Sequence, residues 1–85
     1  MPEISRFFGI AIAIYFDARE PPLFHALSGS HRVIVNIDTG ATSGEFPPRA
    51  LGLVLEWRQH HVSELRENWT FAREGRPLRA IAPLE

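Results

Sequence analysis

The fold of this chain is decided by residues 20–37, EPPLFHALSGSHRVIVNI. The two prolines cannot donate to a β-ladder, and they favour extended backbone in the residues before them. Apolar residues then recur at alternate positions on both sides of Ser28-Gly29-Ser30, which is a compact turn sequence. The stretch therefore predicts a β-hairpin with strands at Leu23–Leu27 and His31–Ile37.

Further strands are expected on both sides of this hairpin. Ile4–Phe8 and Ile10–Phe16 are rich in β-branched and aromatic residues, and Gly9 between them is typical of a bulge or bend. Ile10–Phe16 is apolar on both faces, as expected of a central strand. One more short strand is plausible around Ala41–Glu45. The N-terminal half thus predicts a small antiparallel sheet of three to four strands.

The C-terminal half predicts helix followed by an extended tail. Pro47-Pro48 suits the first turn of a helix, and Gly75 suits its end. We expect one long helix or two coaxial ones, packed on the sheet in a single α+β domain over residues 1–85. At 100° per residue an apolar stripe runs along this helix, with Arg58 inside it; its members are Leu51, Val54, Leu55, Val62, Leu65, Trp69 and Ala72.

A second apolar side of the helix needs its own cover. Leu53 and Trp57 lie outside the stripe, and one sheet cannot cover both sides. Either the tail folds back over this side with Leu78, Ile81 and Leu84, or another chain covers it. We therefore take Leu53 and Trp57, together with Phe24 on the hairpin, as candidate residues for binding a partner.

Composition limits the classes of function. The 85 residues carry a net charge of −1, which gives no general attraction to nucleic acid or anionic membranes. Because there is no cysteine, disulfides, thiolate metal sites and cysteine nucleophiles are excluded. The longest apolar run is far shorter than the ~20 residues of a membrane span, and the start lacks the features of a signal peptide. We expect a cytoplasmic protein without a cofactor.

Basic residues near the C-terminus leave nucleic-acid binding as a weaker alternative. The sequence places arginines beside two aromatic residues that bases stack on, although glutamates are interleaved and largely cancel the charge. The arginines are Arg66, Arg73, Arg76 and Arg79, the aromatic residues are Trp69 and Phe71, and the glutamates are Glu64, Glu67 and Glu74.

Two histidines are weak candidates for catalysis. His25 suits a general acid or base because histidine as a residue type titrates near neutrality, and His31 lies just across the turn and could be its cross-strand neighbour. The alternative is that His25 is a partly buried, hydrogen-bonded residue at the sheet edge. No third ligand stands at a suitable spacing, so we expect no metal site. His60 and His61 are adjacent on a helix and point about 100° apart, which does not suit chelation.

Asp38-Thr39-Gly40-Ala41 follows an apolar strand and resembles the catalytic loop of retroviral-type aspartic proteases. In those enzymes two such loops bring two carboxylates together. The second sequence element of that fold is missing downstream. The alternative is an ordinary turn, in which Asp38 accepts local N–H bonds and Gly40 supplies a positive φ.

Short motifs over almost the whole chain resemble a bacterial family, the domain of unknown function number 4160. They include Pro21-Pro22 before Phe24-His25-Ala26, and also Met1–Ser5, Phe8-Gly9-Ile10, Ile37-Asp38-Thr39, Leu55-Glu56-Trp57, Asn68-Trp69 and Ile81–Leu84. The resemblance implies a small prokaryotic protein, often encoded beside another short family in a toxin–antitoxin-like context. It brings no established catalytic residues. The family commonly has His-Phe-His after the prolines, whereas this chain has Leu23 at the first position, which weakens any two-histidine site.

Three hypotheses of function follow. The first is a non-enzymatic component of a toxin–antitoxin-like pair, which binds a neighbouring gene product or a second copy of itself. The second is a small endoribonuclease toxin that uses His25, with His31 and an arginine as possible helpers. The third is an aspartic-protease-like dimer through Asp38.

Overall fold

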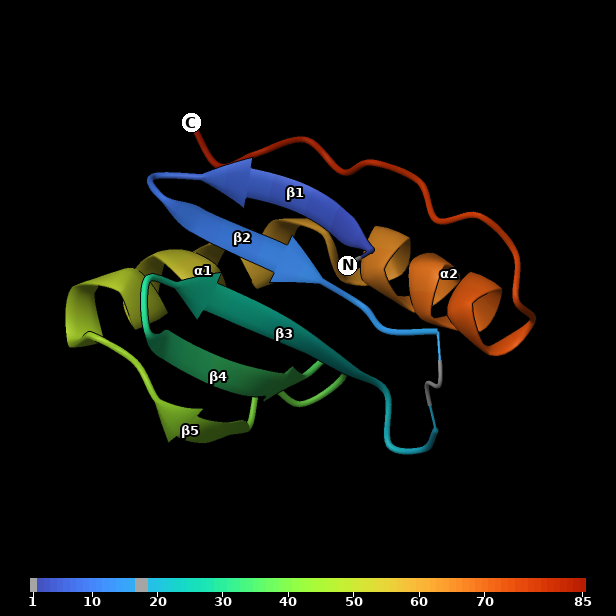
Figure 1. The fold of residues 1–85 in the computed structure, drawn as a ribbon, viewed down its shortest axis with the longest axis horizontal. Coiled ribbons are helices and arrows are strands. Elements are labelled where there is room, and N and C mark those ends of the chain that lie inside the picture. Colours follow the sequence, from blue (N-terminus) through green and yellow to red (C-terminus); the bar gives the residue numbers. More distant parts are fainter. Residues whose placement is uncertain (1, 17–18) are drawn as a thin grey trace.

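The computed structural model describes residues 2–16 and 19–85, and the described chain has an α+β fold. Its antiparallel sheet has the strand order β1-β2-β3-β4-β5, and the helices pack against one face of the sheet (Figure 1). The α+β class is confirmed, with five strands rather than three to four. The strands are β1 (Glu3–Phe7), β2 (Ile10–Ala13), β3 (Leu23–Ser28), β4 (His31–Asn36) and β5 (Thr42–Glu45).

Two tight turns set the register of the sheet. Phe8 and Gly9 both have positive φ, 49° and 77°, so they form a two-residue hairpin turn between β1 and β2. Gly29 has a φ of 58° in the turn between β3 and β4. Across that turn Phe24 lies opposite Val35. Since side chains alternate along a strand, Phe24 and its even-numbered neighbours face the helices, whereas His25 faces away from them.

The helices follow each other with a break of one residue. α1 (Pro48–His60) and α2 (Val62–Arg73) are separated by His61, whose backbone angles of −134° and 24° are not helical. The continuous stripe predicted from the sequence is thus divided between two helices. Both press apolar side chains onto the sheet; the buried helical residues are Val54, Trp57, Leu65, Asn68, Trp69, Phe71 and Ala72.

The C-terminal tail covers the second apolar side of the helices. It runs back beside α2 and β1 (Figure 1). The N–H of Ile81 donates to the carbonyl of Ile4 at 2.8 Å, and Trp57 Nε1 donates to the carbonyl of Ala82 at 2.8 Å. Ile81 is buried, and Leu78 and Leu84 pack against the core. The first of the two expected covers, a folded-back tail, is therefore the one found.

This cover corrects the expectation of an exposed face around Trp57. The Trp57 ring has no exposed surface and packs against Phe7 and Phe24, with ring centroids 5.5 and 5.9 Å away. Phe24 is equally buried. Neither side chain is accessible to a partner, because the tail and the sheet enclose them. Leu53 is half-buried against the core, and its role in binding stays a prediction.

Within the described residues, neither helix has the length and the apolar character that crossing a membrane would require.

Candidate functional site

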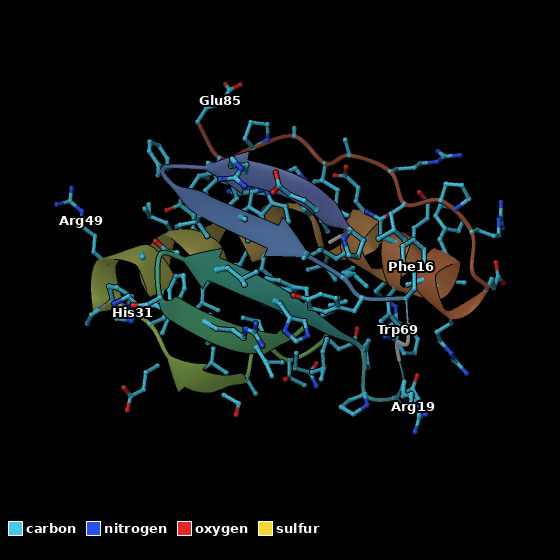
Figure 2. The ribbon with its side chains drawn as sticks, viewed as in Figure 1. Phe16, Arg19, His31, Arg49, Trp69 and Glu85 are labelled. Atoms are coloured by element: carbon cyan, nitrogen blue, oxygen red, sulfur yellow. The ribbon has the colours of Figure 1, made fainter. Side chains whose placement is uncertain are left out.

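The sheet face opposite the helices is the first candidate site. Figures 1 and 2 look onto this face, with the helices behind it. One cross-strand row on it runs Arg6, Ala11, Leu27, Arg32, Glu45, and the next runs Glu3, Ala13, His25, Ile34, Ser43. The middle of the face is therefore mostly apolar, whereas the charged residues are Glu3 and Arg6 on β1, Glu45 on β5 and Arg32 on the interior strand β4.

A hollow of about 400 Å³ opens where β2 and β3 reach the loop between them and α2. Its lining residues are Ile14, Tyr15, Arg19, Glu20, Leu23, His25 and Trp69. The ring of Tyr15 meets the imidazole of His25 edge to face, with centroids 4.6 Å apart. Strand alternation explains this placement, because Tyr15 follows Ala13 on the same face and Ala13 lies opposite His25.

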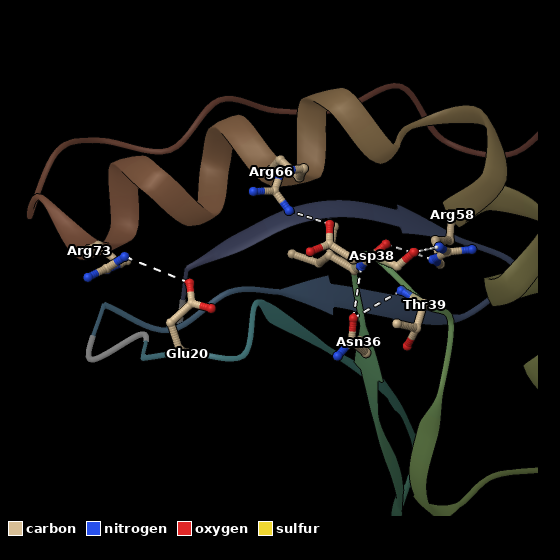
Figure 3. Close-up of polar contacts among 8 residues, drawn as sticks. Glu20, Asn36, Asp38, Thr39, Arg58, Arg66 and Arg73 are labelled. Carbon is tan, nitrogen blue, oxygen red and sulfur yellow. Dashed lines mark hydrogen bonds and ion pairs between the residues drawn. The ribbon is translucent and has the colours of Figure 1, made fainter.

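The charges around the hollow are unevenly paired. Arg73 lies 3.9 Å from the Glu20 carboxylate, and its guanidinium stacks on the Trp69 ring at 4.9 Å (Figure 3 shows the ion pair). The Arg73 guanidinium thus offsets part of the Glu20 charge. Arg19 forms no ion pair with any other residue that the structure describes. The hollow therefore combines the guanidinium of Arg19 and the imidazole of His25 with aromatic and aliphatic walls.

The structure does not bring the two candidate histidines together. His25 lies opposite Ile34, whereas His31 lies opposite Ser28 at the far end of the hairpin. Ser28, the partner of His31, is three residues from His25 along β3, and cross-strand partners share a face, so the two histidines face opposite sides of the sheet. The expectation that His31 is the cross-strand neighbour of His25 is wrong. Over residues 2–16 and 19–85, no three His, Asp or Glu side chains gather closely enough to hold a metal ion.

Of the adjacent histidines His60 and His61, His61 makes local contacts that account for its position. His61 Nδ1 lies 2.6 Å from the Glu64 carboxylate, and the His61 ring packs on Trp57 with centroids 5.3 Å apart. His60 is exposed on α1. His61 therefore joins the two helices at their break, where its side chain contacts both.

The Asp38 loop is an ordinary turn held against the helices (Figure 3). The side-chain oxygen of Asn36 accepts the N–H groups of Asp38 and Thr39 at 2.9 and 3.0 Å. Arg58 donates to the carbonyls of Ile37 and Asp38, both at 2.9 Å. The Asp38 carboxylate is hydrogen-bonded to Arg66 and is 43% exposed.

A cation beside the Asp38 carboxylate is the opposite of the protease arrangement, in which two carboxylates share a proton. The same hydrogen bond raises the pKa of Arg66. These contacts support the turn interpretation, with Gly40 at a φ of 80° as expected, but the side chain that accepts the N–H groups of Asp38 and Thr39 is Asn36 and not Asp38. Arg58 and Arg66 join the loop to both helices.

The C-terminal arginines do not form a free basic patch. Each of the four lies within ion-pair distance of a carboxylate: Arg66 of Asp38, Arg73 of Glu20, Arg76 of Glu74 at 3.1 Å and Arg79 of Glu67 at 3.9 Å. Arg76 and Arg79 also stack over Phe71, at 4.6 and 5.7 Å. One face of the Trp69 ring is covered by Arg73, and Arg76 and Arg79 lie over the Phe71 ring, so these arginines are not available as a basic patch with open stacking rings.

Sequence reasoning missed three members of the hollow. Tyr15, Arg19 and Glu20 lie before the paired prolines, and the sequence directed attention only to His25 after them. The signal for Tyr15 was present in its alternation with Ala13. Arg19 and Glu20 lie in a loop, where no periodic pattern predicts the direction of a side chain.

Comparison with known proteins identifies the chain at family level. The family model described as "Domain of unknown function (DUF4160)" matches residues 9–70. The chain belongs to the DUF4160 family. The matched region starts at the β1–β2 turn and ends in α2, so it includes His25 and Trp69. Neither the curated proteins nor the solved structures gave a match.

Proposed function

We propose that this DUF4160 protein acts by protein–protein interaction rather than by catalysis, and that the uncovered face of its sheet binds a second copy of the chain. The dimer would serve as one component of a toxin–antitoxin-like pair, the role that the family resemblance implies. The observation that carries this proposal is the composition of the face. A solvated face of an antiparallel sheet is normally polar, whereas Leu27 and Ile34 at the centre of this one are apolar and half-buried, beside the buried Ala11 and Ala13.

The edges of the sheet are less suited to binding. The tail lies beside β1, with the Ile81–Ile4 hydrogen bond. β5 is short, polar and exposed throughout its four residues, which are features that discourage pairing with another strand. The face therefore remains as the surface where apolar area can still be buried.

The charges at the borders favour a second copy as the occupant. Consider a twofold axis that runs parallel to the strands through β3. It places β1 of one copy over β5 of the other, and β3 over β3. Arg6 and Glu45 belong to the same cross-strand row, so each Arg6 then meets the other copy's Glu45. Opposite charges meet at both borders, with Leu27 against its own copy in the middle.

Light scattering with size-exclusion chromatography tests this proposal. The native chain is expected at twice its own mass, and Leu27→Arg at the single mass, because the arginine would place two like charges at the axis. Gln59→Arg adds the same charge on α1, on the helical side, and should leave the dimer intact.

A charge exchange tests the orientation. Arg6→Glu alone and Glu45→Arg alone should each weaken the dimer, and the two together should restore it. A native chain that stays monomeric over the accessible concentrations, and that fails to bind the neighbouring gene product, would overturn the proposal. If the gene product binds and Leu27→Arg abolishes that binding, the face is right and its occupant is the heterologous partner.

The hollow supports a second candidate, a small endoribonuclease that uses His25. An imidazole that contacts Tyr15 and lines one hollow with Arg19 supplies a group that can move a proton and a cation that can stabilise a phosphorane-like charge. His31 lies too far away on the opposite face to help. This candidate predicts growth arrest on expression that His25→Ala relieves. Harmless expression with intact cellular RNA would exclude it.

A further inference from the structure

We propose that the hollow between β2, β3 and α2 binds a nucleotide, with the phosphate at Arg19 and His25 and the base against the Tyr15 ring. This inference goes beyond the proposed dimer, because the hollow lies at the loop end of the face. Its volume of about 400 Å³ is in the range of small-ligand sites, which span roughly 300–1,000 Å³.

The charge of the hollow selects an anion. Arg19 has no carboxylate partner among the described residues, and Glu20 is offset by Arg73 at 3.9 Å. The imidazole of His25 also lines the hollow. A guanidinium presents paired donors that match phosphate oxygens, and an imidazole complements it.

The walls select a ligand that also carries a flat ring. Ile14 and Leu23 are aliphatic, Tyr15 is aromatic, and Trp69 adds a second ring. Arg73 stacks on Trp69 and holds it in place. Inorganic phosphate alone would leave these walls in contact with water, and a nucleoside alone would leave Arg19 without a counter-charge. A nucleoside monophosphate uses both halves of the site, whether it is free or one unit of a single-stranded RNA.

Isothermal titration with uridine and adenosine monophosphates tests the site, and tryptophan fluorescence gives a second readout through Trp69. We expect binding of at least one mononucleotide, with uridine and inorganic phosphate each weaker by on the order of tenfold, which corresponds to ~1.4 kcal/mol. Arg19→Ala should weaken the mononucleotide to a similar degree. Glu20→Gln should strengthen it, because Arg73 is then no longer neutralised.

Arg49→Ala is the matched control. Arg49 is also an exposed arginine, and it lies at the opposite end of the molecule from Arg19 (Figure 2). Its removal should leave the affinity unchanged. Neither substitution disturbs the core, and a thermal scan verifies folding.

Two results would overturn the proposal: no heat or fluorescence change at millimolar mononucleotide, or equal affinities of Arg19→Ala and the native chain. A short oligouridylate that binds far more tightly than the monophosphate would show that the hollow binds RNA. Equal affinities of the two ligands would show that it binds the free nucleotide. Either result supports a nucleotide site in the hollow. Light scattering of the same samples separates this outcome from that of the dimer, since Arg19→Ala leaves Leu27 and its surroundings intact.

Discussion

Removing the side-chain amide of Asn68 should release the C-terminal tail. Asn68 is buried on α2, with 1% of its surface exposed. Its Nδ2 donates to the carbonyl of Arg79 at 2.8 Å, and its Oδ1 accepts the N–H of Arg79 at 2.8 Å. The amide thus pairs with the tail as a neighbouring strand would. Asn68→Ala removes both hydrogen bonds and leaves a gap in the helix–tail interface.

The size of the effect follows from these contacts. Each hydrogen bond contributes about 1 kcal/mol, and the lost packing of a buried amide adds roughly 1 kcal/mol more. The backbone of Arg79 regains water when the tail lifts, which limits the penalty. We expect the free energy of unfolding to fall by about 2–3 kcal/mol. A domain of this size has a total of roughly 4–13 kcal/mol and loses about 4–8 °C of Tm per kcal/mol, so Tm should fall by about 10–20 °C.

Urea unfolding followed by tryptophan fluorescence measures this change, and hydrogen exchange locates it. The amide of Ile81, which donates to Ile4, should lose its protection in Asn68→Ala. Arg79→Ala is the control, because Asn68 bonds only the backbone of residue 79, and it should change the stability by less than about 0.5 kcal/mol. The tail is not held in this way if Asn68→Ala is as stable as the native chain, or if both variants lose the same amount.

Two other predictions concern single positions. Gly44 has a φ of 112°, and a Cβ there would approach the carbonyl oxygen of Arg32 to 2.7 Å. Gly44→Ala should therefore lower the free energy of unfolding by about 1–3 kcal/mol and expose the β5 amides to hydrogen exchange. Gly52 lies in open space on α1, so Gly52→Ala should raise the free energy of unfolding measured in urea by about 1 kcal/mol. The hydrogen bond from Arg6 lowers the pKa of Glu3. Its small stabilisation is therefore present above the unfolded-state pKa and lost as pH falls through the folded-state pKa, and NMR titration should find that pKa restored in Arg6→Gln.

Much of the fold could be predicted because it rests on local rules. The alternation of apolar residues in 23–37 predicted both strands of the central hairpin. The proline pairs predicted where β3 and α1 begin, and Gly75 predicted where the helical region ends. The helical stripe identified Val54, Leu65 and Trp69 as buried, as they are. These patterns reflect which side of a single strand or helix is buried, and the spacing of apolar residues within that element is enough to show it.

What could not be predicted depends on contacts between distant elements. α1 ends at His60, and His61 has non-helical backbone angles. The apolar stripe continues across this point, so the periodicity does not show where the helix breaks. Whether the tail or another chain would cover Trp57 was open in the sequence, and it is decided by hydrogen bonds from Trp57 and Asn68 to tail carbonyls. The hollow was missed for the same reason, since Arg19 reaches it from a loop and Trp69 from a helix.

Alternation along β3 separates the residues that hold the fold from those that face the candidate sites. Phe24 and Ala26 are buried under the helices, so changing them would disturb the core. His25 and Leu27 point to the other side, where His25 lines the hollow and Leu27 lies between Ala11 and Arg32 in its cross-strand row. Because successive residues of one strand divide in this way, Leu27 can be changed without touching the core residues on the opposite face. His25 shares the face with Leu27 on the axis strand, so Arg19 in the loop is the position that tests ligand binding separately from dimerisation.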